Sequence, residues 1–139
     1  MPRCGRAWGW CLAAAAAAGC AGTPTPPGTG TEQAVRGYFE ALLRQDWAEA
    51  YAALDPGGRA RCTPEQFARL AANYRRDLGL EPEAVAVRSC DERGAEAVAH
   101  VTIRGRAGAR LRFYKDAITL RRGGAGWGVV LPANFGRGR

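Results

Sequence analysis

The stretch from Ala84 to Pro132 constrains the fold most, because it consists of short β-forming runs separated by glycine-containing turns. Between Ala95 and Arg104, small or branched apolar residues occupy the odd positions and mostly polar residues the even ones, which predicts a strand with one buried face. We therefore predict a four-stranded antiparallel sheet. Its strands are expected at 84–90, 95–104, 109–122 and 127–131, with turns at 91–94, 105–108 and 123–126.

The third of these strands breaks the alternation. Leu111 and Phe113 are odd-numbered, whereas Ile118 and Leu120 are even-numbered, so a regular strand would place the two pairs on opposite faces. One extra residue inserted between 114 and 117 would restore a single apolar face. The pattern therefore predicts a β-bulge at that position.

Three helices are predicted before the sheet, each with an apolar stripe of helical spacing or a capping signal. Thr29 or Thr31 is a candidate cap for the first helix, and Asp46 for the second. Thr63 followed by a proline marks the start of the third. The expected helices are Glu32–Gln45, Trp47–Leu54 and Thr63–Leu78, and the sequence Asp-Pro-Gly-Gly at 55–58 predicts a break after the second.

Helices followed by strands indicate an α+β domain, with three N-terminal helices packed on a curved four-stranded antiparallel sheet. A chain of 139 residues is expected to hold one such domain. We assign the domain to residues 31–134 and a basic tail to residues 135–139.

The first twenty residues resemble an export signal. Arg3 and Arg6 precede a small apolar run from Cys11 to Ala18, and Gly19-Cys20 follows. Ala17-Ala18-Gly19-Cys20 is similar to the bacterial lipobox, with alanine where leucine is usual. We expect a signal peptide at 1–19, an acylated Cys20 and a Gly/Thr/Pro-rich flexible tether at 20–30. Ordinary secretion and an unprocessed chain are the alternatives.

The segments 35–42, 46–51 and 118–130 together resemble the nuclear transport factor 2-like superfamily, in particular small bacterial lipoproteins of unknown function. The resemblance covers about Glu32 to Leu131 and rests on packing motifs. It implies a cone-shaped fold with a pocket at its mouth. The superfamily includes isomerases, cyclases and many proteins that only bind. The candidate pocket-lining residues here are Tyr38, Tyr51, Tyr74 and Tyr114.

Two cysteines, Cys62 and Cys90, lie in the mature domain. If the helix that follows Cys62 packs antiparallel to the strand that ends at Cys90, the two reach the same end of the domain. In an oxidising compartment this predicts a disulfide, detectable as a mass gain of two protons on reduction. Two reduced cysteines are the alternative. A single histidine and the lack of a CxxC motif give no expectation of a metal or other cofactor.

His100 is the only histidine and the one side chain that would normally titrate near neutral pH. If its face of the strand lined the pocket, His100 could act as a general base with Asp116 or Tyr114. This would make the protein an isomerase- or cyclase-like enzyme. A hydrogen-bonded surface or core histidine is the plainer interpretation, as a helix cap is for Asp46.

The formal charge of +7 is concentrated in the second half of the chain. Arg104, Arg106, Arg110 and Arg112 surround one predicted hairpin and are candidates for binding an anionic lipid or cell-wall polymer. A solvated edge that resists aggregation is the alternative. Nucleic acid is not an expected partner, because no aromatic residues for base stacking alternate with these arginines.

These features lead to one principal hypothesis. The protein is expected to be a membrane-tethered extracytoplasmic lipoprotein, anchored to the cell or outer membrane, that binds a small hydrophobic molecule or a protein without catalysis. The alternatives are the His100 enzyme and a basic domain that adheres to lipid or cell wall. A homodimer through the sheet face would also be compatible with the resemblance.

Overall fold

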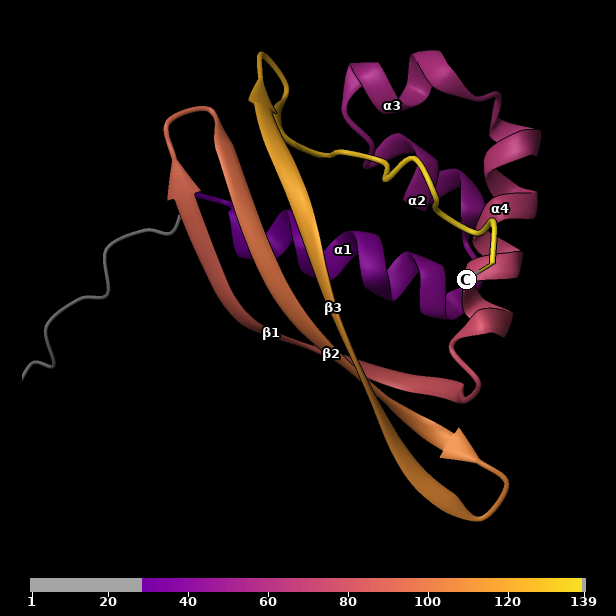
Figure 1. Cartoon of the computed structure of the whole chain (residues 1–139). Helices are drawn as coiled ribbons and strands as arrows, with labels where there is room; N and C mark the ends of the chain where they lie inside the picture. Colours follow the sequence, from indigo (N-terminus) through magenta and orange to yellow (C-terminus); the bar gives the residue numbers. More distant parts are fainter. Residues whose placement is uncertain (1–28, 139) are drawn as a thin grey trace, which may run out of the picture.

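The computed structural model describes residues 29–138 as an α+β fold in which helices pack against one face of an antiparallel sheet (Figure 1). The expected signal peptide, Cys20 and most of the tether lie outside these residues. The helices are α1 (Thr31–Arg44), α2 (Trp47–Ala52), α3 (Pro56–Arg61) and α4 (Pro64–Asp77). The strands are β1 (Glu81–Arg93), β2 (Glu96–Ala107), β3 (Arg110–Gly123) and β4 (Gly126–Val129), in the order β1-β2-β3-β4.

Two of the predicted helix caps are present. The Asp46 carboxylate accepts a hydrogen bond from the Glu49 amide at 3.0 Å and begins α2. Thr63 and Gln66 form a complete capping box at the start of α4. These local signals act through backbone groups a few residues away, so they are readable without knowledge of the tertiary fold.

The cap predicted for α1 is wrong. Its N-cap is Gly30, and no side chain of the helix caps it. The hydroxyl groups of Thr29 and Thr31 instead donate to the carboxylate of Glu92 on β1. The sheet thus supplies an acidic group at the positive end of the helix dipole, where a negative charge is favourable.

The break predicted at residues 55–58 is in fact the start of a further helix. The Asp55 carboxylate accepts a hydrogen bond from the Gly58 amide at 2.7 Å, and Pro56 occupies the first turn of α3. Proline is favoured there because its missing N–H would have had no partner within the helix. Residues 55–58, which follow the end of α2, therefore begin α3, and four helices precede the sheet in the described part of the chain instead of three.

The bulge predicted in the third strand is also wrong. β2 and β3 pair in unbroken register from Glu96↔Arg121 to Ala107↔Arg110. The register shifts lie in β1 instead, between Pro82 and Ala84 and between Val87 and Ser89. Bulges bend a strand, and β1 curves around α1 at this part of the sheet (Figure 1). Leu111 and Phe113 consequently stay on the face opposite Ile118 and Leu120.

The main core lies between the helices and the inner face of the sheet. The odd-numbered residues of β2 from Ala97 to Ile103 are buried, as the alternation predicted. They face the apolar stripe of α1, which packs along β1 and also contacts β2. The larger buried side chains are Val35, Tyr38, Phe39, Leu42, Leu54, Phe67, Val101, Ile103, Leu120 and Val129.

The C-terminal segment Pro132–Gly138 folds back across the helices toward α4 (Figure 1). Phe135 is 8% exposed and stacks on the rings of Phe67 and Tyr74, at centroid distances of 5.8 and 5.0 Å. The Asn73 side chain donates to the Gly136 carbonyl at 3.1 Å. The expected tail from residue 135 therefore starts with residues that belong to the packed domain.

Candidate functional site

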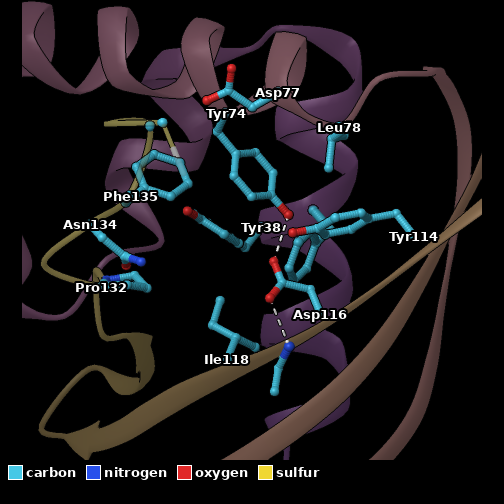
Figure 2. Close-up of a pocket in the computed structure, with 14 residues that line it drawn as sticks. Tyr38, Tyr74, Asp77, Leu78, Tyr114, Asp116, Ile118, Pro132, Asn134 and Phe135 are labelled. Carbon is cyan, nitrogen blue, oxygen red and sulfur yellow. Dashed lines mark hydrogen bonds between the residues drawn. The ribbon is translucent and has the colours of Figure 1, made fainter.

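A pocket of about 190 Å³ opens between α1, α4, β3 and the C-terminal segment (Figure 2). Each of these elements contributes side chains to the pocket wall. Tyr38 comes from α1, Tyr74 from α4, Tyr114 and Asp116 from β3, and Phe135 from the C-terminal segment. The remaining lining residues are Phe39, Asp77, Leu78, Ala117, Ile118, Pro132, Asn134, Gly136 and Gly138.

Asp116 is the polar centre of this pocket. It lies on the same side of β3 as the buried Ile118, and its side chain is half-buried. One carboxylate oxygen accepts a hydrogen bond from the Tyr74 hydroxyl at 2.7 Å (Figure 2). The other accepts from the Ala117 amide at 2.9 Å. The first bond connects α4 to β3, the second lies within β3, and together they orient the carboxylate.

Two tyrosines share the electrostatic field of Asp116. Burial is the main cause that raises the pKa of Tyr38 and of Tyr74 well above the ordinary phenol value, and the negative charge of Asp116 raises both further. The hydrogen bond to Asp116 adds to the shift at Tyr74. Both hydroxyl groups therefore stay protonated at neutral pH, and the proton of Tyr74 is the one donated to Asp116.

The pocket differs in charge from the protein as a whole. The chain carries 20 lysines and arginines against 13 acidic residues. Among the described residues that line the pocket, however, Asp77 and Asp116 are acidic and none is basic. No ion pair involving either carboxylate occurs between residues 29 and 138. The pocket is therefore a negatively charged site in a positively charged protein.

Three of the four candidate tyrosines, Tyr38, Tyr74 and Tyr114, surround this one pocket. Tyr51 lies elsewhere. Its ring packs against Phe67 at 5.7 Å, and its hydroxyl donates to the carbonyl groups of Arg59 and Cys62. Tyr51 thus holds α2 against the segment between α3 and α4.

His100 and Asp116 do not form the pair expected of an enzyme. His100 is exposed and lies opposite Ala117 in the β2–β3 register. Ala117 and Asp116 are consecutive in β3, so their side chains point to opposite faces. His100 therefore lies on the outer face of the sheet, whereas Asp116 points into the pocket. The condition for a His100 site, that its face of the strand lines the pocket, is therefore not met with either Asp116 or Tyr114 as the partner, since both have the parity of the inner face.

The expected disulfide is not formed, because Cys62 and Cys90 are both free. The prediction assumed that β1 packs along α4, but β1 packs along α1. Cys90 consequently lies near Glu32 at the start of α1, and burial together with this acidic group raises the pKa of its thiol. The Cys62 sulfur lies 3.6 Å from the Gly58 carbonyl in α3.

The four candidate arginines gather at the end of the β2–β3 hairpin, as the sequence indicated. They are distributed over both of its faces. Arg104 and Arg106 lie opposite Phe113 and Leu111 in the register and share the outer face with them. Arg110 and Arg112 have the parity of the inner face. Arg106 also pairs with Glu83 at 2.9 Å.

Sequence reasoning missed three acidic or aromatic members of the pocket, Phe39, Asp77 and Phe135. Asp77 could have been found, because it lies three residues after Tyr74 and so shares its face of the helix. Phe135 follows Pro132 in a glycine-rich segment without periodicity. No local pattern places its ring against α4.

Among residues 29–138, no group of three His, Cys, Asp or Glu side chains could hold a metal ion. In that same range, no helix is long and apolar enough to cross a membrane.

The chain has an α+β fold that is similar to the fold of solved NTF2-like (nuclear transport factor 2-like) structures. Solved structures support this assignment. A Campylobacter jejuni protein assigned as an NTF2-like transpeptidase aligns with a TM-score of 0.53 at 14% identity, over 73% of this chain and 97% of that one. The likeness shows the fold alone.

Two proteins described as containing a SEC-C motif are also similar. The one from Rhodopseudomonas palustris aligns with a TM-score of 0.58 at 14% identity, over 74% of this chain and 77% of that one. The one from Psychrobacter arcticus aligns with a TM-score of 0.57 at 11% identity, over 73% of this chain and 59% of that one. No protein-family model and no curated protein sequence matches the chain.

Proposed function

We propose that this protein is a small-molecule-binding module without catalysis, held at the outside of a membrane by an acylated Cys20. The pocket carries the proposal, since three tyrosines and Phe135 surround a fixed carboxylate in a space of about 190 Å³. Such a concave, mostly apolar site with few convergent polar groups is typical of ligand binding. The volume suits a ligand of about one aromatic ring.

Ligand-observed NMR with benzyl alcohol, a neutral one-ring probe, tests the binding proposal on the full chain in detergent. Saturation transfer to the probe is expected for the natural protein. It should be lost in Asn134→Trp, where an exposed pocket residue is replaced by a ring that fills the space. Ala133→Trp is the matched control, because Ala133 is also exposed but does not line this pocket. Equal transfer in all three proteins, or none in any, contradicts the proposal.

The membrane tether is tested separately, by replacing Cys20. Acyl chains add about 0.8 kcal/mol of membrane affinity for each buried methylene, so Cys20→Ala should release the protein from the membrane fraction. Mass spectrometry of the natural protein should show acylation at Cys20 with residues 1–19 removed. An unmodified Cys20 in a membrane-bound chain would contradict this part.

A second candidate function is adhesion to an anionic surface through the end of the β2–β3 hairpin. Leu111 and Phe113 are 51% and 60% exposed there, beside Arg104 and Arg106. Arginines attract acidic headgroups, while exposed apolar side chains can enter the interface. We name residues 104–113 the basic hairpin.

Vesicle co-sedimentation tests the basic hairpin, with phosphatidylglycerol vesicles against phosphatidylcholine vesicles. The Cys20→Ala protein removes the acyl anchor from the comparison. Binding to the anionic vesicles alone, reduced by salt and by Phe113→Ser, is expected. Equal sedimentation with both lipids contradicts adhesion. If the protein instead forms a dimer that is insensitive to salt and dissociates in Phe113→Ser, this face binds a second copy of the chain.

A further inference from the structure

The pocket carries information on the charge of its ligand. Its two carboxylates, Asp77 and Asp116, are not balanced by any arginine, lysine or histidine among the described lining residues. Seven of the eleven other carboxylates in the described part of the chain form ion pairs, as Asp55 does with Arg121 at 3.3 Å. Asp77 is exposed, but Asp116 is half-buried, and a charge that is partly removed from water is costly unless it is paired. A cation is therefore the partner that the pocket lacks.

Asp116 has hydrogen-bonding capacity left for such a partner. A carboxylate offers about four lone-pair positions. The Tyr74 hydroxyl and the Ala117 amide use one each, on different oxygens. Both bonds come from the protein's own neutral groups, so they orient the carboxylate without cancelling its charge. The remaining positions can accept from an ammonium group.

The rest of the wall is aromatic. Tyr38, Tyr74, Tyr114 and Phe135 all line the same space, and the Phe135 and Tyr74 rings are stacked with 24° between their planes. Aromatic faces attract cations, by about 0.5 to 2 kcal/mol for each well-placed contact. Burial and the charge of Asp116 raise the pKa of Tyr38 and Tyr74, so these two side chains keep the neutral phenol form at physiological pH. They therefore add no negative charge of their own.

We propose that the pocket binds an organic cation, namely a protonated amine or a quaternary ammonium carried on a small apolar or aromatic body. The ammonium group lies against Asp116, and the body fills the space between the tyrosines and Phe135. An anionic ligand of the same shape is disfavoured by both carboxylates. This inference rests on the proposed binding function and adds the chemical class of the ligand.

The experiment measures dissociation constants by NMR titration for three one-ring probes that differ mainly in charge. Benzylamine is cationic at pH 7, benzyl alcohol is neutral and benzoate is anionic. Benzylamine should bind about tenfold more tightly than benzyl alcohol, which corresponds to one close charge-assisted contact. Benzoate should bind more weakly than either.

Asp116→Asn should abolish the preference for benzylamine over benzyl alcohol. Asparagine keeps the shape and can still accept from the Tyr74 hydroxyl. Asp91→Asn is the matched control, because Asp91 is an exposed carboxylate on the outer face of β1, opposite Val98. It should leave the preference unchanged. The probe series on the natural protein tests the same inference without depending on how any variant folds.

The possible results separate the two proposals. If benzyl alcohol and benzylamine bind with equal affinity, the pocket binds small molecules but the inference of a cation is wrong. The same holds if benzoate binds most tightly. If none of the three binds, the proposed binding function fails and the inference fails with it.

Discussion

The two faces of β3 offer opposite surfaces within one strand. Tyr114 and Asp116 point into an acidic, aromatic pocket, whereas Leu111 and Phe113 point outward beside arginines. Neighbouring positions in the same strand thus differ in burial, in charge and in the kind of partner they fit. The strand itself is regular, because its pairing with β2 has no register shift.

The difference arises from what covers each face. α1, α4 and the C-terminal segment lie against the inner side, and they close a pocket over Asp116. The end of the β2–β3 hairpin extends past the helices (Figure 1). Alternation along a strand fixes only which residues share a face. The packing of distant segments decides whether that face becomes a pocket wall or an exposed surface.

The largest expected effect compares two glycines, one in the pocket wall and one at the tip of the basic hairpin. Gly136 and Gly108 both have φ +61°, but an added Cβ at Gly136 would lie 2.0 Å from the Leu70 carbonyl oxygen. At Gly108 nothing lies within 4 Å. Gly136→Ala should lose about 4 kcal/mol of unfolding free energy, from backbone strain and overlap. Gly108→Ala should lose about 1 kcal/mol, from strain alone.

Urea unfolding of the full chain measures both glycine variants under one set of conditions. The pair is matched in backbone angle and in the atom added, so the difference reports the contact between the C-terminal segment and α4. Equal losses would mean that this segment is not packed on α4 in solution. The pocket would then lack the wall formed by Phe135.

The second comparison uses two phenylalanines. Phe135 is 8% exposed and stacked between aromatic rings, while Phe113 is 60% exposed. Phe135→Ala should lower the unfolding free energy by about 3 kcal/mol, because it leaves a cavity. Phe113→Ala should change it by less than about 0.5 kcal/mol, as is usual at surface positions. Thermal or urea unfolding checks both. A large loss at Phe113 would show that its face is covered, for example by a second copy.

Much of the fold was predictable because its signals are local. The capping box at Thr63, the cap at Asp46 and the alternation of β2 involve residues within a few positions of one another. The α+β class followed from the order of these elements. The three tyrosines around the pocket were predictable only from the resemblance to a family, because no local pattern indicates them.

The failures have long-range causes. The bulge prediction assumes that Leu111 and Phe113 are buried, but both are exposed. The disulfide was inferred by assuming that β1 packs on α4, but it packs on α1. Asp55-Pro-Gly-Gly was interpreted only as a break, although the same residues can cap a new helix. Phe135 reaches the pocket through a turn that leaves no periodic pattern.

The smallest predicted effect is a loss of stability at alkaline pH that is caused by the buried tyrosines Tyr38 and Tyr74. The folded protein holds Tyr38 and Tyr74 in the neutral form, since their pKa values are raised above the ordinary 10.0. Below pH 10 both folded and unfolded chains carry neutral phenols, so stability does not change. Above it the unfolded chain ionises first. The free energy of unfolding should therefore fall, by up to about 1.4 kcal/mol per pH unit for each tyrosine.

Urea unfolding at pH 8.0, 9.5 and 10.5 (chosen to bracket the ordinary phenol pKa) measures this slope. Tyr74→Phe removes one ionising group, so above pH 10 it should lose less stability per pH unit than the natural protein. At pH 8 the same variant should cost about 1 kcal/mol, because the bond to Asp116 is lost. An unchanged slope would mean that the Tyr74 phenol is free to ionise in the folded state. The pocket would then be open to water at Tyr74. The two faces of β3 would differ in charge but not in burial.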